Sequence, residues 1–140
     1  METRKAAIKV RLMTGTYQLG YIQARNKKVK DPNCVLCQTE PEDEKHFIAR
    51  CPVLEGKRSL YLDKIIQLTR EKPWKNITDL EADSDGTLLT QLVIDCTLYM
   101  DMQQEKGPEA KEWYNTMEKT CRDFIYALHQ VRSSKIKLLL

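Results

Sequence analysis

The sequence predicts a mainly α-helical protein in which a small element rich in cysteine and histidine lies between short helices and is followed by a three-helix C-terminal part. Three observations support this fold class. Apolar residues recur every three or four positions in several segments, which is the spacing of amphipathic helices. No run alternates convincingly between apolar and polar residues, so a sheet of any size is not expected. Three of the five cysteines and one of the two histidines fall between Cys34 and Cys51.

The basic N-terminal segment predicts two short helices. In residues 3–13, five apolar side chains lie among cations, as in an amphipathic helix: Ala7, Ile8, Val10, Leu12 and Met13. Gly15 ends this helix, because glycine adopts the left-handed conformation of a C-terminal cap. A second short helix is expected between residues 17 and 29. The turn-forming residues Asp31-Pro32-Asn33 then lead to the first cysteine of the cluster.

The cluster has the spacing C-x2-C-x8-H-x4-C and consists of Cys34, Cys37, His46 and Cys51. Structural zinc sites use four thiolate and imidazole ligands in a tetrahedron. Two cysteines separated by two residues can direct both sulfurs at one ion. The longer gap lets the second pair approach from another direction. The sequence therefore predicts a zinc knuckle, with one structural Zn²⁺ bound by these four side chains.

The gap inside the cluster predicts a helix from about residue 40 to residue 50. Thr39 and Glu42 have the T-x-x-E spacing of a capping box. On a continuous α-helix, His46 and Cys51 would lie about 140° apart, too far to share one ion easily. Pro52 resolves this conflict, because proline biases the preceding residue away from the helical conformation.

Two alternatives to a metal site remain open for the cluster. Its members could be buried free cysteines with one core histidine, or the C-x-x-C pair could be redox-active. A redox pair normally lies between a strand and a helix, whereas this motif follows a turn in a helical chain. Outside the cluster, Cys96 and Cys121 lie on apolar stripes and are expected to be small buried hydrophobic residues. His129 is expected near the end of the last helix and not as a ligand.

Three further helices are predicted after the cluster, over residues 54–68, residues 87–102 and from Pro108 onward. Proline suits the first turn of a helix, and Gly107 breaks the chain before it. The apolar stripe of the last helix is the clearest in the sequence and comprises Trp113, Met117, Cys121, Phe124, Ile125, Leu128 and Arg132. We therefore divide the chain into a basic arm with the cluster at 1–72 and a helical tail at 73–140. The tail is expected to pack on the first part and to begin with an acidic linker at 73–86.

The composition fits one folded domain. The chain has 140 residues, of which 41% are hydrophobic and 31% charged, with a net charge of +3. Its longest apolar run is far shorter than the roughly 20 residues that span a bilayer, so no membrane contact is expected. The residues after Met1 lack the apolar segment of a secretory signal. We expect an intracellular protein, nuclear or cytoplasmic, with reduced thiols.

Positive charge is concentrated at the start of the chain. Residues 1–30 carry eight Lys or Arg against Glu2 alone, whereas residues 73–112 are acidic. A basic arm before the cluster suits a polyanionic partner, with a solvated helix face as an equal alternative. Phosphates of RNA or DNA are expected to contact Arg4, Lys5, Lys9, Arg11, Arg25, Lys27, Lys28, Lys30, Arg50, Lys57 and Arg58. Candidates for stacking on unpaired bases are Tyr17, Tyr21 and Phe47, of which Phe47 is also a candidate for the core.

Two phrases of the sequence together resemble one family. The first is R-L-x-T-G, formed by Arg11, Leu12, Thr14 and Gly15. The second, C-x2-C followed by H-F-x3-C-P, is formed by Cys34, Cys37, His46, Phe47, Cys51 and Pro52. Residues 8–70 thereby resemble the zinc-binding region C-terminal to the reverse transcriptase of non-LTR (LINE-type) retrotransposons. One departure is Lys45, which stands where that family usually has an acidic residue before the histidine; Glu44 lies one place earlier.

This resemblance implies zinc binding and contact with RNA or DNA as an accessory to a polymerase, and it implies no activity for this segment. The sequence is consistent with the expectation of no activity, because the chain has no paired aspartates of the kind that hold two Mg²⁺ in a reverse transcriptase. Asp83 and Asp85 are expected in a loop that caps the next helix. We therefore expect a non-enzymatic nucleic-acid-binding module. The alternative is a zinc-stabilised helical domain that binds a protein partner through its C-terminal helices, without nucleic acid.

Overall fold

The computed structural model describes residues 2–28, 30–71, 80, 83, 85–99 and 107–139. These residues form no strand, and their one pairing of extended backbone is a bridge between Asn33 and Pro41. The α-helices are α1 (Glu2–Thr14), α2 (Gly20–Arg25), α3 (Glu55–Glu71), α4 (Thr87–Ile94) and α5 (Pro108–Leu139). Shorter helical segments are the π-helix η1 (His46–Arg50) and the 3-10 turns η2 (Pro52–Leu54) and η4 (Cys96–Tyr99). The predicted mainly helical fold class, with the Cys/His element between short helices, is confirmed.

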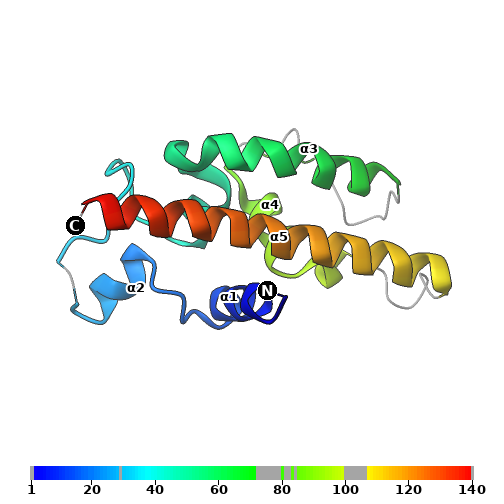
Figure 1. The fold of residues 1–140 in the computed structure, drawn as a ribbon, viewed down its shortest axis with the longest axis horizontal. Coiled ribbons are helices and arrows are strands. Elements are labelled where there is room, and N and C mark those ends of the chain that lie inside the picture. The colour runs from blue at the N-terminus through cyan, green and yellow to red at the C-terminus, as the bar shows by residue number, and fades with distance from the viewer. Residues whose placement is uncertain are drawn as a thin grey trace.

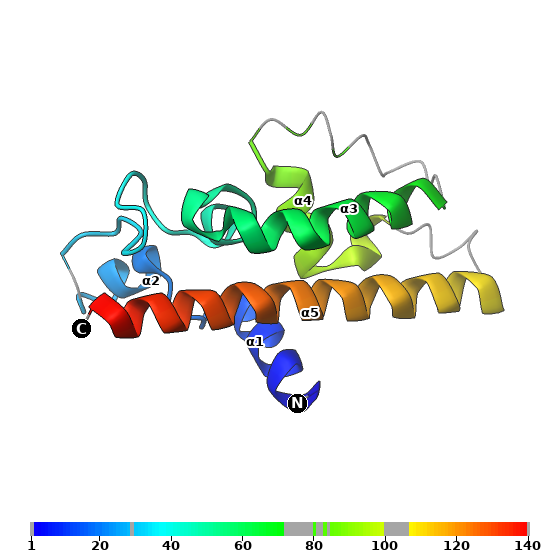
Figure 2. The same cartoon turned by 45° about the horizontal axis from the view of Figure 1, so that its top comes forward.

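Helix α5 is the axis of the molecule. It runs along the full length of the described fold, with α3 along one side and α1 crossing the other (Figures 1 and 2). The indole N–H of Trp113 donates a 2.7 Å hydrogen bond to the carbonyl of Leu68, which ties α5 to α3. The buried residues of α5 include every member of the predicted stripe. The stripe is therefore the core-facing side of this helix.

One hydrophobic core joins the two predicted parts of the chain. Ile8 of α1, Phe47 of η1 and Phe124 of α5 are buried members of the same cluster. Their relative exposures do not exceed 4%. Because the N-terminal part, the Cys/His element and α5 share this core, the element is held directly by the long helix.

The predicted helix ends are partly confirmed. Gly15 has a φ of 72°, the left-handed conformation expected after α1. The carboxylate of Asp83 accepts hydrogen bonds from the amides of Leu88 and Leu89 at 3.3 and 3.0 Å, so it caps α4 as predicted. The second short helix, α2, occupies only the middle of its predicted range.

The prediction of one continuous helix over residues 87–102 is wrong. Helix α4 ends at Ile94, and Asp95 is extended. The Asp95 carboxylate accepts hydrogen bonds from the amide and hydroxyl of Thr97 at 3.0 and 2.5 Å. This local side-chain bonding competes with the helix and starts the 3-10 turn η4 instead.

Some predicted features lie outside the described residues. These are most of the acidic linker at 73–86 and the end of the predicted helix over 87–102. Among the helices that the structure does describe, none is both long and apolar enough to cross a membrane.

Candidate metal centre

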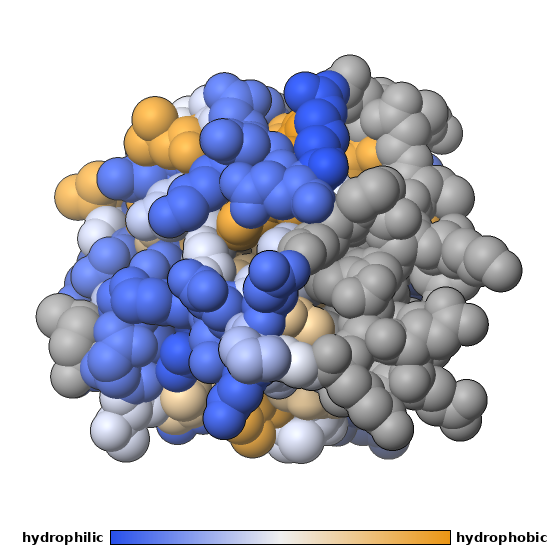
Figure 3. Space-filling view, turned by 90° about the vertical axis from the view of Figure 1, so that its right-hand side faces the viewer, coloured by the Kyte–Doolittle hydropathy of each residue, from blue (hydrophilic) through white to orange (hydrophobic). Residues whose placement is uncertain are grey.

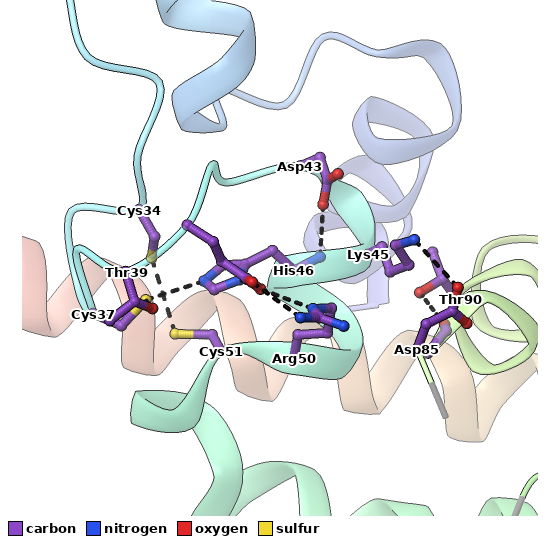
Figure 4. A network of polar contacts seen from close by, with 12 residues as sticks. Cys34, Cys37, Thr39, Asp43, Lys45, His46, Arg50, Cys51, Asp85 and Thr90 are labelled. Atoms are coloured by element: carbon purple, nitrogen blue, oxygen red, sulfur yellow. Dashed lines mark hydrogen bonds and ion pairs between the residues drawn. The ribbon is translucent and has the colours of Figure 1, made fainter. Parts of the chain in front are cut away.

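The four predicted ligands converge on one point. The candidate ligand atoms of Cys34, Cys37, His46 and Cys51 all lie within 4.8 Å of one another. The sulfurs of Cys34 and Cys51 are 3.9 Å apart, and the Cys37 sulfur lies 3.3 Å from Nε2 of His46 (Figure 4). Three of these residues are buried, and Cys37 is half-buried. A cluster of this composition and compactness could bind a metal ion.

A tight turn positions the first pair of cysteines. The amide of Cys34 donates to the carbonyl of Glu40 at 2.9 Å, and the amide of Gln38 donates to the carbonyl of Cys34 at 2.8 Å. Gln38 reverses the chain in a left-handed conformation, with a φ of 59°. The amides of Leu36 and Cys37 face the Cys34 sulfur, and such hydrogen bonds favour a thiolate.

A π-helical turn positions the second pair. The amide of Cys51 donates to the carbonyl of His46 at 2.8 Å, five residues earlier, which is the bond that defines a π-turn. This wider turn closes the angle that would separate the two side chains on an α-helix. Cys51 itself leaves the helical region, with ψ at 119°, as Pro52 predicts. The prediction that Cys51 leaves the helical conformation before Pro52 is therefore confirmed, whereas the π-turn was not predicted.

The predicted capping box is wrong. The amide of His46 donates to Oδ1 of Asp43 at 2.7 Å, so Asp43 is the cap and helical backbone begins at Glu44. Thr39 instead places its hydroxyl 3.2 Å from the Cys37 sulfur. The reason is the bridge between Asn33 and Pro41, which holds the chain extended where the first helical turn was expected.

A carboxylate orients the histidine. Oε1 of Glu40 lies 2.6 Å from Nδ1 of His46, and Arg50 binds both oxygens of the same carboxylate at 2.8 and 3.0 Å. The hydrogen bonds from Arg50 and then from His46 lower the pKa of Glu40 to about 2. The charged carboxylate holds the proton on Nδ1 and leaves Nε2 to face the sulfurs. Sequence reasoning missed Glu40 because nothing in its spacing marks it as a partner.

The two buried sulfurs, of Cys34 and Cys51, lie within hydrogen-bonding distance of each other. The hydrogen bond to Cys51 and then burial raise the pKa of the Cys34 thiol, whereas the same hydrogen bond lowers the pKa of Cys51. Amides of Val53 and Leu54 also face the Cys51 sulfur. A divalent cation suits this arrangement, because thiolates are the metal ligands and metal binding displaces thiol protons.

Two of the predicted phosphate contacts lie inside the fold. Arg58 is 2% exposed, and its guanidinium donates to the carbonyls of Ile48 and Cys51, both at 2.9 Å. It thereby satisfies carbonyls at the end of η1. Lys9 is 4% exposed and forms an ion pair with Glu118 of α5. Both cations stabilise the fold, and both are too buried to contact a phosphate.

The remaining predicted cations are more accessible. Lys5 is half-buried and paired with Asp123 at 2.8 Å, and the exposed Arg50 is engaged by Glu40. The exposed residues of the set that carry none of these strong pairs are Arg4, Arg11, Arg25, Lys27, Lys28, Lys30 and Lys57.

The proposed stacking residues are mostly unavailable. Tyr17 and Phe47 are buried and stack on each other, with ring centroids 5.3 Å apart. Both belong to the core and cannot reach a base. Tyr21 is half-exposed, and its hydroxyl donates to Glu44 at 2.7 Å.

The other cysteines and the second histidine lie apart from the cluster. Cys96 and Cys121 are buried as predicted, and burial raises the pKa of Cys96 to about 12, so its thiol stays protonated. The prediction of a helix-end position for His129 is wrong, because α5 continues to Leu139. Nδ1 of His129 shares a 2.7 Å hydrogen bond with the Tyr17 hydroxyl.

A buried ion pair joins α5 to the segment of residues 31–43, which carries Cys34 and Cys37 and is called the metal loop below. Glu42 is 1% exposed and Arg132 is 8% exposed, and Arg132 binds both carboxylate oxygens at 2.8 Å. The amide of Gly20 donates to the same carboxylate at 2.9 Å. A Cβ on Gly20 would meet the carbonyl oxygen of Pro32 at 2.6 Å, so only glycine lets α2 approach this closely. Sequence reasoning counted Arg132 in the stripe but gave neither charged residue this role.

Comparison with protein-family models, with curated proteins and with solved structures found no match to this chain.

Proposed function

We propose that this protein is a non-enzymatic nucleic-acid-binding module whose structure is held by one Zn²⁺ bound to Cys34, Cys37, His46 and Cys51. The observation that carries the proposal is the convergence of three sulfurs and one imidazole nitrogen within 4.8 Å. The proposed partner is RNA or DNA.

Two of the distances between ligand atoms are close to those in a zinc tetrahedron. Zn–S bonds of about 2.3 Å and Zn–N bonds of about 2.0–2.1 Å in a tetrahedron separate two sulfurs by about 3.8 Å and a sulfur from a nitrogen by about 3.6 Å. The corresponding distances are 3.9 Å for Cys34 and Cys51 and 3.3 Å for Cys37 and His46. Four protein ligands leave no open position for a reacting water, which supports a structural role.

Exposed charge supports a polyanionic partner. The seven exposed cations without a strong partner lie on α1, on α2 with the segment after it, and on α3. Phosphates would neutralise them, as Lys and Arg side chains do in nucleic-acid complexes. The motifs shared with LINE-type elements point the same way and suggest a fragment associated with a reverse transcriptase. A reducing compartment, nuclear or cytoplasmic, would keep the thiols available for zinc.

The protein-interaction alternative has less support. The apolar stripe that it requires is buried against this chain's own helices. Figure 3 shows the end of the molecule from which α5 begins: hydrophilic residues dominate its described surface, and hydrophobic residues form small separate patches. The described part of this face therefore shows no large apolar area of the kind that marks a protein-binding surface.

The test is a titration of zinc-loaded protein into fluorescently labelled RNA and single-stranded DNA, followed by anisotropy over a range of salt concentrations. If phosphate contacts dominate, the logarithm of the affinity falls linearly with the logarithm of the salt concentration. A variant with alanine at Arg25, Lys27 and Lys28 should bind more weakly. Absence of binding by the zinc-loaded wild type, or a flat salt response, favours the protein-interaction alternative.

A further inference from the structure

A cavity lies where three segments distant in sequence meet. Its volume is about 530 Å³. It is lined by Gly20 and Gln23 of α2, by Cys34 and Gln38 of the segment between α2 and η1, and by Arg132 and Ile136 of α5. Both ribbon views place α2 beside the C-terminal end of α5 (Figures 1 and 2). The cavity therefore lies at the end of the molecule where α2 and the C-terminal end of α5 meet.

Positive charge surrounds this cavity from two directions. Residues 20–34 and 132–139 contain seven Lys or Arg, and with Asp31 and the cavity-lining Glu42 set against them the balance is +5. Four of these cations lie on α2 and the segment after it, and all four are exposed: Arg25, Lys27, Lys28 and Lys30. On α5, Lys135 and Lys137 are exposed as well. The last two cations come from the helical tail, which the basic N-terminal arm does not include.

The residues that line the cavity combine apolar with polar side chains, and Arg132, the cation among them, is already paired. Arg132 is neutralised by Glu42, and Glu42 is in turn satisfied by Arg132 and the amide of Gly20. The remaining polar lining includes the side-chain amides of Gln23, Asn33 and Gln38. Amides donate and accept hydrogen bonds, as base edges require. The cavity volume lies within the usual range of small-molecule sites, so a single base fits.

We infer that a single strand of nucleic acid crosses the mouth of this cavity, with its phosphates on the cations of α2 and α5 and one unpaired base inside. A duplex keeps its bases stacked and cannot offer one to the cavity. This inference rests on the proposed function and deepens it, because it names the single-stranded form and adds Lys135 and Lys137 to the contact surface.

The experiment compares two variants of α5. One carries Lys135→Ala and Lys137→Ala at the cavity, and the matched control carries Lys111→Ala and Lys119→Ala at the other end of the same helix. Both remove two exposed lysines, and alanine preserves helix propensity. Full-length zinc-loaded proteins are titrated into a labelled single-stranded 20-mer, with an unlabelled duplex of the same sequence as competitor. Circular dichroism verifies that both variants fold.

The expected result is a loss of roughly tenfold in affinity for the cavity variant, with its salt slope lowered by about 1.4 for two lost contacts to a single strand. The control stays within about twofold of the wild type, and the duplex competes at least tenfold more weakly than the single strand. Equal losses in both variants, or no loss at the cavity, overturn the inference. If the duplex competes as strongly as the single strand, the inference that the bound nucleic acid is single-stranded is overturned. Absence of any binding by the wild type overturns the proposed function itself.

Discussion

The guanidinium of Arg132 and the carboxylate of Glu42, 90 positions apart in the sequence, form a buried bidentate ion pair with two hydrogen bonds of 2.8 Å. Glu42 belongs to the metal loop and Arg132 to α5. The thiol of Cys34 lies 3.8 Å from the same carboxylate. This pair fixes the loop that carries the first two cysteines to the long helix, so the candidate metal site is tied directly to the core.

Replacing Arg132 with alanine should strongly destabilise the protein. The change leaves the carboxylate of Glu42 buried without its countercharge, which typically costs about 3–5 kcal/mol. Urea unfolding of the zinc-loaded protein, followed by circular dichroism, measures the loss. Lys135→Ala, an exposed position on the same helix, is the control and should change stability by less than about 0.5 kcal/mol. A similar small change for Arg132→Ala would show that the pair does not hold the loop.

Glu40→Gln should weaken metal binding while preserving the fold. The amide can still accept a hydrogen bond from His46 but lacks the charge that holds the proton on Nδ1. Losses of partners of this kind reduce metal affinity by about 10–100-fold. Competition with a chromophoric zinc chelator measures the affinity. Glu44→Gln is the matched control, because Glu44 bonds Tyr21 and none of the ligands; equal affinities for the two variants would contradict this role.

Gly86→Ala should destabilise the packing of α4 on the π-turn. Gly86 has a φ of 84°, and a Cβ there would lie 2.4 Å from that of Ala49 in η1. The left-handed conformation and the overlap together should cost about 2–4 kcal/mol. Gly56→Ala in α3 is the control, since no atom lies within 4 Å of its Cβ position. That change should be neutral or stabilising by up to about 1 kcal/mol in urea unfolding. Equal effects at both glycines would refute the close approach.

His129 should contribute a pH dependence to stability. Burial, and then the cations Arg132, Arg11 and Arg4, lower the pKa of this imidazole in the folded protein. The unfolded chain therefore takes up a proton first, as the pH falls through the usual histidine value near 6.5. Stability from the neutral imidazole is fully present above that value and is lost as the pH falls towards the folded pKa.

The variant His129→Gln removes this titration. Between about pH 7.5 and pH 5.5, the wild type should lose more unfolding free energy than the variant. Both proteins contain the same Cys/His cluster and differ only at position 129, so the difference between the two urea-unfolding series isolates His129. A difference that stays constant with pH would mean that the imidazole has an ordinary pKa.

The features predicted correctly from sequence depend on local pattern. The stripe of α5 follows from its helical spacing, the left-handed Gly15 from the cap it supplies, and the meeting of Cys34 with Cys37 from their separation by two residues. In each case the determining residues lie within a few turns of one another, where backbone geometry leaves little choice.

The features that were missed depend on contacts between distant segments. The capping box at Thr39 lost to Asp43 because pairing of Asn33 with Pro41 kept the chain extended. From sequence, Lys9 and Arg58 were predicted to be surface cations. In the structure both are buried, because Lys9 pairs with Glu118 and Arg58 donates hydrogen bonds to two backbone carbonyls. A charge pattern alone does not show which cations have such partners. The proposed contact surface therefore consists of the cations that the structure leaves exposed.

Native mass spectrometry of the whole chain before and after chelation tests the proposed zinc site directly. We expect one bound zinc ion per chain, lost on chelation together with helical circular dichroism, and absent from Cys37→Ser and His46→Ala. A zinc-free chain whose helical content is the same with and without chelator would contradict a structural zinc site.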